Sequence, residues 1–99
     1  MAHRLAPRAE LDLDDIWLHV ARESGSIDIA NRLIDAITDR FLTLGHFPFM
    51  GRSRDEDFGP GRRSLAIGEY VIVYCVENED AFILRVVHGR RQLEAVFGH

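Results

Sequence analysis

Apolar residues recur at helical spacing through the first half of the chain. In residues 9–21 and again in residues 30–44 they follow one another mostly three or four positions apart, which places each set on one face of an α-helix. Gly25 ends the first stripe, and Ser26 is well suited to cap the second. The pattern therefore predicts two helices joined by a short turn, as in an antiparallel helical hairpin. The stripes consist of Ala9, Leu13, Ile16, Trp17, Val20 and Ala21 in the first helix, and of Ala30, Leu33, Ile34, Ile37, Phe41 and Leu44 in the second.

The boundaries of this hairpin are also marked in the sequence. His3–Ala6 precedes Pro7 and is expected to form an edge strand, where proline is tolerated. Gly45 and Pro48 are expected to stop the second helix. The segment 49–61 is polar and contains several glycines, so it is expected to be a surface loop.

Alternating apolar residues dominate the chain after this loop. Tyr70–Val76 and Phe82–Val87 have the pattern of strands, and Leu65 and Ile67 indicate a further strand before them. The predicted order is β-α-α-β-β-β in a single domain that spans residues 1–99. We therefore expect an α+β fold in which the helical hairpin packs on a small, mainly antiparallel sheet, with a short C-terminal helix or arm.

The predicted sheet is apolar on both faces. In its central strand Tyr70, Ile72 and Tyr74 point one way, while Val71 and Val73 point the other. A solvated face of an antiparallel sheet would carry polar residues, and one helical hairpin covers only one face. Either the C-terminal tail or another protein chain is expected to cover the second face, and the sequence favours neither.

Composition and charge narrow the classes of function. All twelve basic residues are arginine and the formal net charge is −4, so the chain lacks the overall positive field of a generic nucleic-acid-binding domain. Cys75 is the single cysteine, which excludes an internal disulfide and a thiolate metal cluster. The five histidines lack metal-ligand spacing, and neither a metal nor a cofactor is expected. Because no signal-peptide core or membrane-length apolar run is present, we expect a cytoplasmic protein without a membrane partner.

Several short motifs match a known family in order and spacing, and together they span nearly the whole chain. Each motif is unspecific by itself, and the ordered set is what carries the match. On this set the chain resembles the ParE branch of the RelE/ParE superfamily of bacterial toxins. The motifs are Ala9-x-x-Asp12-Leu13-x-x-Ile16, Leu44-x-x-x-Pro48-x-x-Gly51-Arg52, Arg63-Ser64, Tyr70-Val71-Ile72-Val73-Tyr74 and Ile83-Leu84-Arg85-Val86-Val87-His88-Gly89-Arg90-Arg91.

The resemblance implies a toxin that is expressed with an adjacent, ParD-like, DNA-binding antitoxin, which silences it in a hetero-oligomer. ParE toxins poison DNA gyrase, whereas RelE toxins cut messenger RNA on the ribosome, and the shared fold does not decide between the two. We expect an inhibitor of DNA gyrase that is not an enzyme and that binds no specific nucleic-acid sequence by itself. A ribosome-dependent mRNA endonuclease, and a complex-forming partner that has lost its toxicity, are the alternatives.

Candidate groups for RNA cleavage are few. Arg63 and Arg85 could steady a phosphate, and His88 could act as an acid or base. However, the chain has no lysine, no tyrosine follows His88, and Phe97 cannot transfer a proton. These departures from the RNA-cleaving relatives argue against catalysis, and no catalytic residue is expected.

The C-terminal tail is the predicted contact with the cellular target. Gly89 permits a sharp change of chain direction, and adjacent arginines cannot both serve one internal ion pair because they point to different faces. Arginine and aromatic side chains are the strongest anchors of protein interfaces. The predicted target-binding residues are His88, Arg90, Arg91, Leu93 and Phe97.

A second set of residues is predicted to bind the antitoxin. Leu11 and Leu18 lie off the main stripe of the first helix, and we expect an antitoxin segment to contact them together with Trp17, Arg63 and Arg85. For Arg85 an internal ion pair is equally consistent with the sequence, because a partly buried arginine needs a carboxylate or several carbonyls as partners.

Overall fold

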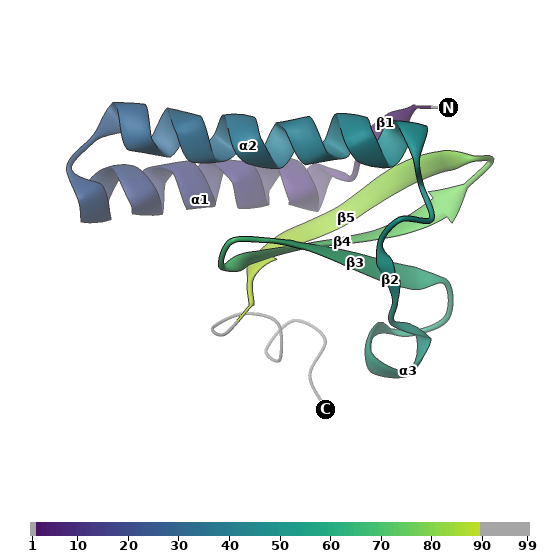
Figure 1. Ribbon diagram of the computed structural model, residues 1–99. Coiled ribbons are helices and arrows are strands. Elements are labelled where there is room, and N and C mark those ends of the chain that lie inside the picture. Colours follow the sequence, from purple (N-terminus) through teal and green to yellow (C-terminus); the bar gives the residue numbers. More distant parts are fainter. Residues whose placement is uncertain (1, 90–99) are drawn as a thin grey trace.

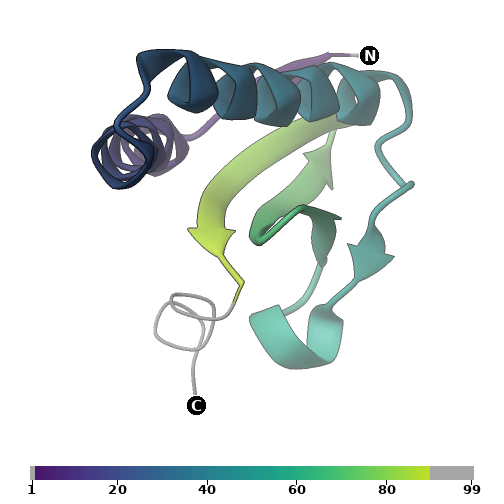
Figure 2. The same ribbon diagram turned by 60° about the vertical axis from the view of Figure 1, so that its left-hand side comes forward.

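The computed structural model describes residues 2–89 and has a helical hairpin stacked on one face of a five-stranded sheet (Figures 1 and 2). The strand order is β1-β5-β4-β3-β2, in which β1 is parallel to β5 and the other neighbours are antiparallel. The predicted α+β fold is confirmed. The elements are β1 (His3–Leu5), α1 (Pro7–Ser24), α2 (Ile27–His46), β2 (Arg52–Ser53), α3 (Asp55–Phe58), β3 (Arg62–Ile67), β4 (Tyr70–Glu77) and β5 (Asp80–His88).

Helix α1 begins at Pro7, before the first residue of its apolar stripe. Proline is favoured in the first turn of a helix because the first N–H groups have no partner within the helix and the φ angle of proline is already helical. At the other end Gly25 adopts a left-handed φ of 69°, and its N–H donates to the carbonyl of Ala21 at 2.9 Å. The predicted end of the first helix is therefore confirmed, and its start lies earlier than the stripe indicated.

Helix α2 is capped as the sequence predicts, because the Ser26 hydroxyl accepts the N–H of Ile29 at 3.2 Å. The prediction for Gly45 was wrong, since this residue lies inside the helix, which ends at His46. A Cβ atom at Gly45 would lie 3.1 Å from the carbonyl carbon of Ala2. Glycine is needed here because the first strand passes close to the end of the helix, not because the helix stops.

The segment 49–61 is not the plain surface loop that its polarity suggested. It contains strand β2 and the short helix α3, which lies on the side of the sheet away from the hairpin (Figures 1 and 2). Phe58 is buried there, and the guanidinium of Arg54 lies 4.2 Å from the centre of its ring. Helix α3 therefore covers part of the second apolar face, which the sequence left to the tail or to another chain.

The main core lies between the hairpin and the facing side of the sheet. Strand β5 contributes to it through a bulge, because Val73 pairs with Arg85 whereas the next residue, Tyr74, pairs with Ile83. The strict alternation predicted for this strand was therefore wrong, and Ile83 and Val86 both face the core. The buried members of this core are Ala9, Ile16, Ile37, Phe41, Leu44, Tyr70, Ile72, Tyr74, Ala81, Ile83 and Val86.

Candidate functional site

A buried ion pair joins α1 to β5. Asp12 is 4% exposed, and its two carboxylate oxygens accept hydrogen bonds from Nε and Nη2 of Arg85 at 2.8 and 3.0 Å. The same carboxylate accepts the backbone N–H of Val86 at 2.9 Å, and Nε of Arg8 lies 3.6 Å from it. The internal ion pair that the sequence allowed for Arg85 is thus present.

The position of this ion pair follows from the length of β1. Strand β1 pairs with β5 only as far as Leu5, after which Ala6 donates to the carbonyl of Ile83 and the chain turns into α1. Beyond that point no strand among residues 2–89 lies beside β5 on this side to accept the N–H of Val86. Asp12 supplies that acceptor from the second turn of α1, and Arg85, beside the bulge, bonds the same carboxylate.

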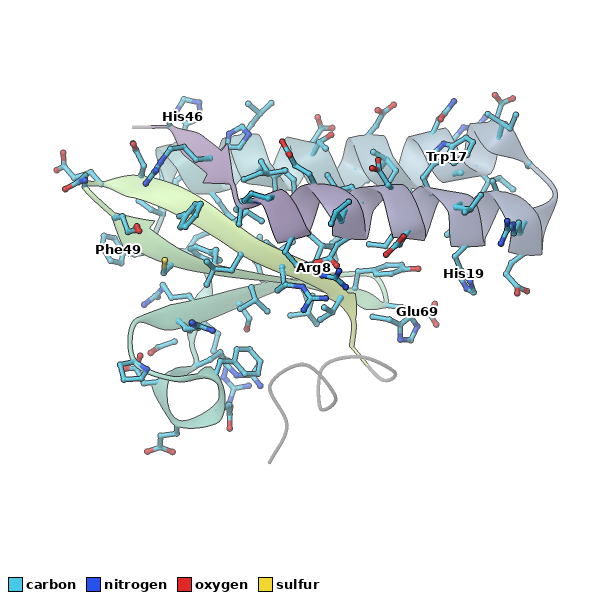
Figure 3. All side chains as sticks on the ribbon, turned by 180° about the vertical axis from the view of Figure 1, so that it is seen from behind. Arg8, Trp17, His19, His46, Phe49 and Glu69 are labelled. Atoms are coloured by element: carbon cyan, nitrogen blue, oxygen red, sulfur yellow. The ribbon has the colours of Figure 1, made fainter. Side chains whose placement is uncertain are left out.

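A groove separates the middle of α1 from the adjoining ends of β4 and β5. It holds two adjacent cavities of about 220 and 310 Å³, and His19, Tyr70 and His88 line both. Tyr70 and His88 are directly opposite in the sheet register, with their rings edge to face at 5.4 Å. Figure 3 shows His19 extending from α1 toward Glu69, which follows β3 and also lines the larger cavity. The sequence missed this groove because its parts come from distant segments.

The opposite end of the molecule carries an exposed apolar turn (Figure 3). Phe47, Phe49 and Met50 are 66%, 68% and 46% exposed, in a turn closed by a hydrogen bond from Met50 N–H to the carbonyl of Phe47 at 3.1 Å. No role for these three residues was predicted from the sequence. Three large apolar residues around Pro48, outside either helical stripe, were the signal that could have revealed them.

This turn is held rigidly by residues of the sheet. The hydroxyl of buried Tyr74 donates to the carbonyl of Pro48 at 2.8 Å and accepts the N–H of Gly51 at 2.9 Å. Any Cβ atom at Gly51 would collide with this hydroxyl. Nη2 of Arg63 donates to the carbonyls of Phe49 and Gly51, so this predicted antitoxin contact is engaged within the chain.

The outer side of the hairpin carries the other predicted antitoxin contacts. Leu11 and Leu18 are 52% and 42% exposed, as their positions off the stripe predicted. Trp17 is partly buried, and its Nε1 donates to Oδ1 of Asn31 at 2.8 Å, which ties the two helices together. Trp17 also lines a shallow cavity of about 540 Å³ bounded by residues of β1, α1 and α2.

Metal and thiol chemistry find little support in the part of the chain that the structure describes. Residues 2–89 contain no group of three or more histidine, cysteine or acidic side chains arranged to hold a metal ion. Burial raises the pKa of the Cys75 thiol, and the nearby carboxylate of Glu77 raises it further. This thiol is therefore a poor nucleophile at neutral pH. Among the described helices, none is both long and apolar enough to cross a membrane.

Comparison with known proteins places this fold in a family. Residues 4–93 match the family described as the ParE toxin of the type II toxin–antitoxin system parDE. This chain belongs to the ParE toxin family. The resemblance seen in the sequence motifs is thereby confirmed, and it extends over almost the whole chain.

Two relatives of the ParE family come from Caulobacter vibrioides. Toxin ParE3 is 33% identical over 87 residues, which cover 88% of this chain and 85% of the relative. Toxin ParE1 is also 33% identical, with coverage of 97% of each chain. The chain is thus a type II toxin–antitoxin toxin of ParE type along its full matched length.

Solved structures of toxin–antitoxin complexes share the fold. A chain of the chromosomal ParDE system from P. aeruginosa has a TM-score of 0.77 at 23% identity, covering 89% of this chain and 95% of that one. A chain of the RelBE2 complex from Mycobacterium tuberculosis has a TM-score of 0.61 at 22% identity, covering 88% and 95%. At these identities the likeness concerns the fold alone.

Of the predicted target-binding residues, the structure places only His88. This histidine closes β5, and its Nε2 lies 3.7 Å from a carboxylate oxygen of Glu69. Arg90, Arg91, Leu93 and Phe97 lie outside the described residues. For this member of the ParE family the tail therefore remains a prediction from sequence, whereas the hairpin surface and the groove have a defined geometry.

Proposed function

We propose that this chain arrests bacterial growth by inhibiting DNA gyrase and that a ParD-like antitoxin silences it by covering the outer side of the helical hairpin. The observation that carries the proposal is the family match over residues 4–93, because it concerns nearly the whole toxin domain. ParE toxins are gyrase poisons, as the sequence resemblance implied.

The exposed side of the hairpin supports the antitoxin contact. Leu11 and Leu18 lie seven residues apart on α1, so they face the same way and leave an apolar strip in contact with solvent. The cavity beside Trp17 adds a concave surface that is also lined by residues of α1. An amphipathic segment that folds on binding is the kind of partner such a surface accepts.

The tail is the proposed contact with gyrase. Its arginine pair and its apolar residues combine the side-chain types that anchor interfaces, and in the sequence it follows closely on His88, the last residue of β5. Arg63 and Arg85 contribute differently from the sequence prediction, because their guanidinium groups are engaged inside the domain. In this proposal they hold the surfaces in place and do not contact a partner directly.

The chemistry of the groove speaks against the alternative, an RNA endonuclease. His88 has a carboxylate of Glu69 as its neighbour, and Asp15 lines the same groove. Carboxylates beside His88, the acid or base considered for RNA cleavage, would repel the phosphate that an RNase must bind. Arginine alone stabilises charge without transferring protons.

The test combines purified toxin with gyrase and with RNA. We expect the toxin to inhibit supercoiling by gyrase, and expression in cells to cause filamentation and a DNA-damage response. Purified antitoxin encoded by the neighbouring gene should reverse the inhibition. Total RNA and translated messages should stay intact in the same cells. Site-specific cleavage of messages that disappears in His88→Ala, with gyrase unaffected, would show that the endonuclease alternative is correct.

A further inference from the structure

The groove between α1 and the ends of β4 and β5 carries unbalanced negative charge. Asp15, Glu23 and Glu69 line its two cavities and are all exposed. Asp12 also lines the groove, but Arg85 and the N–H of Val86 already use its oxygens. Within residues 2–89 no arginine lines either cavity. Nε2 of His88 lies 3.7 Å from the carboxylate of Glu69, but within residues 2–89 none of these three exposed carboxylates has an arginine partner of the kind that Asp12 has.

The same groove also has apolar and aromatic lining residues, beside the histidines His19 and His88. Ile16 and Val86 line the smaller cavity, Val20 and Leu33 line the larger one, and Tyr70 lines both. Both cavities are several times larger than the roughly 30 Å³ that one water molecule occupies in the liquid, so they have room for a side chain. Apolar lining residues beside exposed carboxylates match a long side chain with an aliphatic stem and a cationic head.

We propose that this groove is a docking site for an arginine or lysine side chain that a partner protein presents from a segment of aliphatic residues. The stem lies against Ile16, Val20 and Tyr70, and the cationic head lies between the carboxylates of Asp15 and Glu69. The site is separate from the hairpin strip of Leu11 and Leu18, and it does not depend on gyrase being the cellular target. It gives this acidic toxin a point at which a basic partner segment is selected.

Other occupants fit the groove less well. A bare metal ion lacks a set of three suitably placed ligands among the described residues. A nucleic acid would bring phosphates toward three exposed carboxylates, which costs electrostatic energy. The remaining rival is the chain's own arginine pair, Arg90-Arg91. These residues directly follow Gly89 in the sequence, and the N–H of Gly89 donates a hydrogen bond to the carbonyl of Glu69, which lines the groove. The experiment is designed to separate this rival from a partner protein.

The probe is a fluorescein-labelled helical peptide made of alanine, leucine and arginine, and the same peptide with glutamate in place of arginine is the reference. Fluorescence anisotropy at low salt with the full chain should show binding of the arginine peptide only. The double variant Asp15→Asn/Glu69→Gln should weaken this binding by about tenfold, because two cationic contacts are lost. The control Glu56→Gln removes one negative charge from an exposed site on α3 and should leave the affinity unchanged.

A second pair of variants tests the location without changing the core. His19 is exposed and lines both cavities, so His19→Arg places a guanidinium of the chain's own at the groove, whereas His19→Gln does not. We expect His19→Arg to abolish binding of the arginine peptide and His19→Gln to retain it. Equal loss in Glu56→Gln, or equal binding by His19→Arg and the original chain, would overturn the proposal.

The variant Arg90→Gln/Arg91→Gln decides between the partner and the tail. If the groove serves a partner, the double variant should bind the arginine peptide with the affinity of the original chain. A tenfold gain in affinity would mean that the chain's own arginines occupy the groove, and the proposal of a partner would then be wrong. Each variant is checked for an unchanged unfolding midpoint, so that a loss of binding is not a loss of fold.

Discussion

At the scale of single residues, Asp12 joins the two layers through hydrogen bonds from α1 to β5. Its carboxylate replaces a missing strand neighbour for Val86 and neutralises Arg85, whose side chain is 16% exposed. Removing one partner of a buried ion pair leaves the other charge uncompensated in a poorly solvated site. The contribution of Asp12 to stability therefore includes the cost of leaving Arg85 and the N–H of Val86 without their acceptor.

We expect Asp12→Asn to lower the free energy of unfolding by about 3 kcal/mol, because Arg85 stays buried without a counter-charge. Urea unfolding followed by the fluorescence of Trp17 measures the change as a lower midpoint at an unchanged slope. Asp15→Asn is the matched control, since this exposed carboxylate on the same helix should alter stability by no more than about 0.5 kcal/mol. Similar small effects of both variants would contradict the role assigned to Asp12.

At the scale of elements, the strands and helices divide their tasks. The hairpin presents an apolar strip and one wall of the groove, while β5 ends beside that groove and leads into the tail. Helix α3, only four residues long, supplies cover for the second face through Phe58. In the proposed function the antitoxin and the cellular target contact different elements, so their binding should be separable by deletion.

Removing residues Arg90 to His99 tests this separation. We expect growth arrest to disappear while antitoxin affinity stays within about tenfold, or roughly 1.4 kcal/mol, because the antitoxin contacts mainly the hairpin. Plating efficiency and isothermal calorimetry measure the two effects, and the melting temperature shows whether the domain stays folded. If Leu93 and Phe97 instead fill the core, the melting temperature and both activities fall together. A stable truncation that remains toxic would contradict the tail as the target contact.

At the scale of the whole molecule, exposed apolar surface connects binding to stability. A partner that binds only the folded toxin raises its stability by about 2.7 kcal/mol when present at a hundred times its dissociation constant. The large exposed apolar residues are spread over both ends of the molecule. Replacing them at different sites therefore tests which surface the antitoxin covers.

The double variant Leu11→Ser/Leu18→Ser should weaken antitoxin binding by roughly 2 kcal/mol, or about thirtyfold, because two apolar side chains no longer become buried. It should also reduce the antitoxin-induced rise in melting temperature, whereas the melting temperature of the free toxin should stay unchanged. The matched control is Leu42→Ser, which removes a leucine that is 56% exposed near the C-terminal end of α2. An equal loss of affinity in Leu42→Ser would show that the antitoxin covers a different surface.

The sequence by itself determined the local elements and the family. The helical hairpin followed from two apolar stripes and from the signals at Gly25 and Ser26, which act through neighbouring backbone groups. The strands β4 and β5 followed from alternation. These features could be predicted because their causes lie within a few residues of their effects.

Only the tertiary structure decided which residues meet. The sequence allowed Arg85 either an internal ion pair or a contact with the antitoxin. The structure shows the ion pair, because the short β1 leaves room beside β5 for Asp12, which lies 73 positions earlier in the chain. Gly51 is explained by the hydroxyl of Tyr74 and not by its own turn. The acidic groove likewise exists only because α1 packs across the ends of β4 and β5. Such contacts depend on strand lengths, bulges and packing over the whole chain, and no local pattern of residues records them.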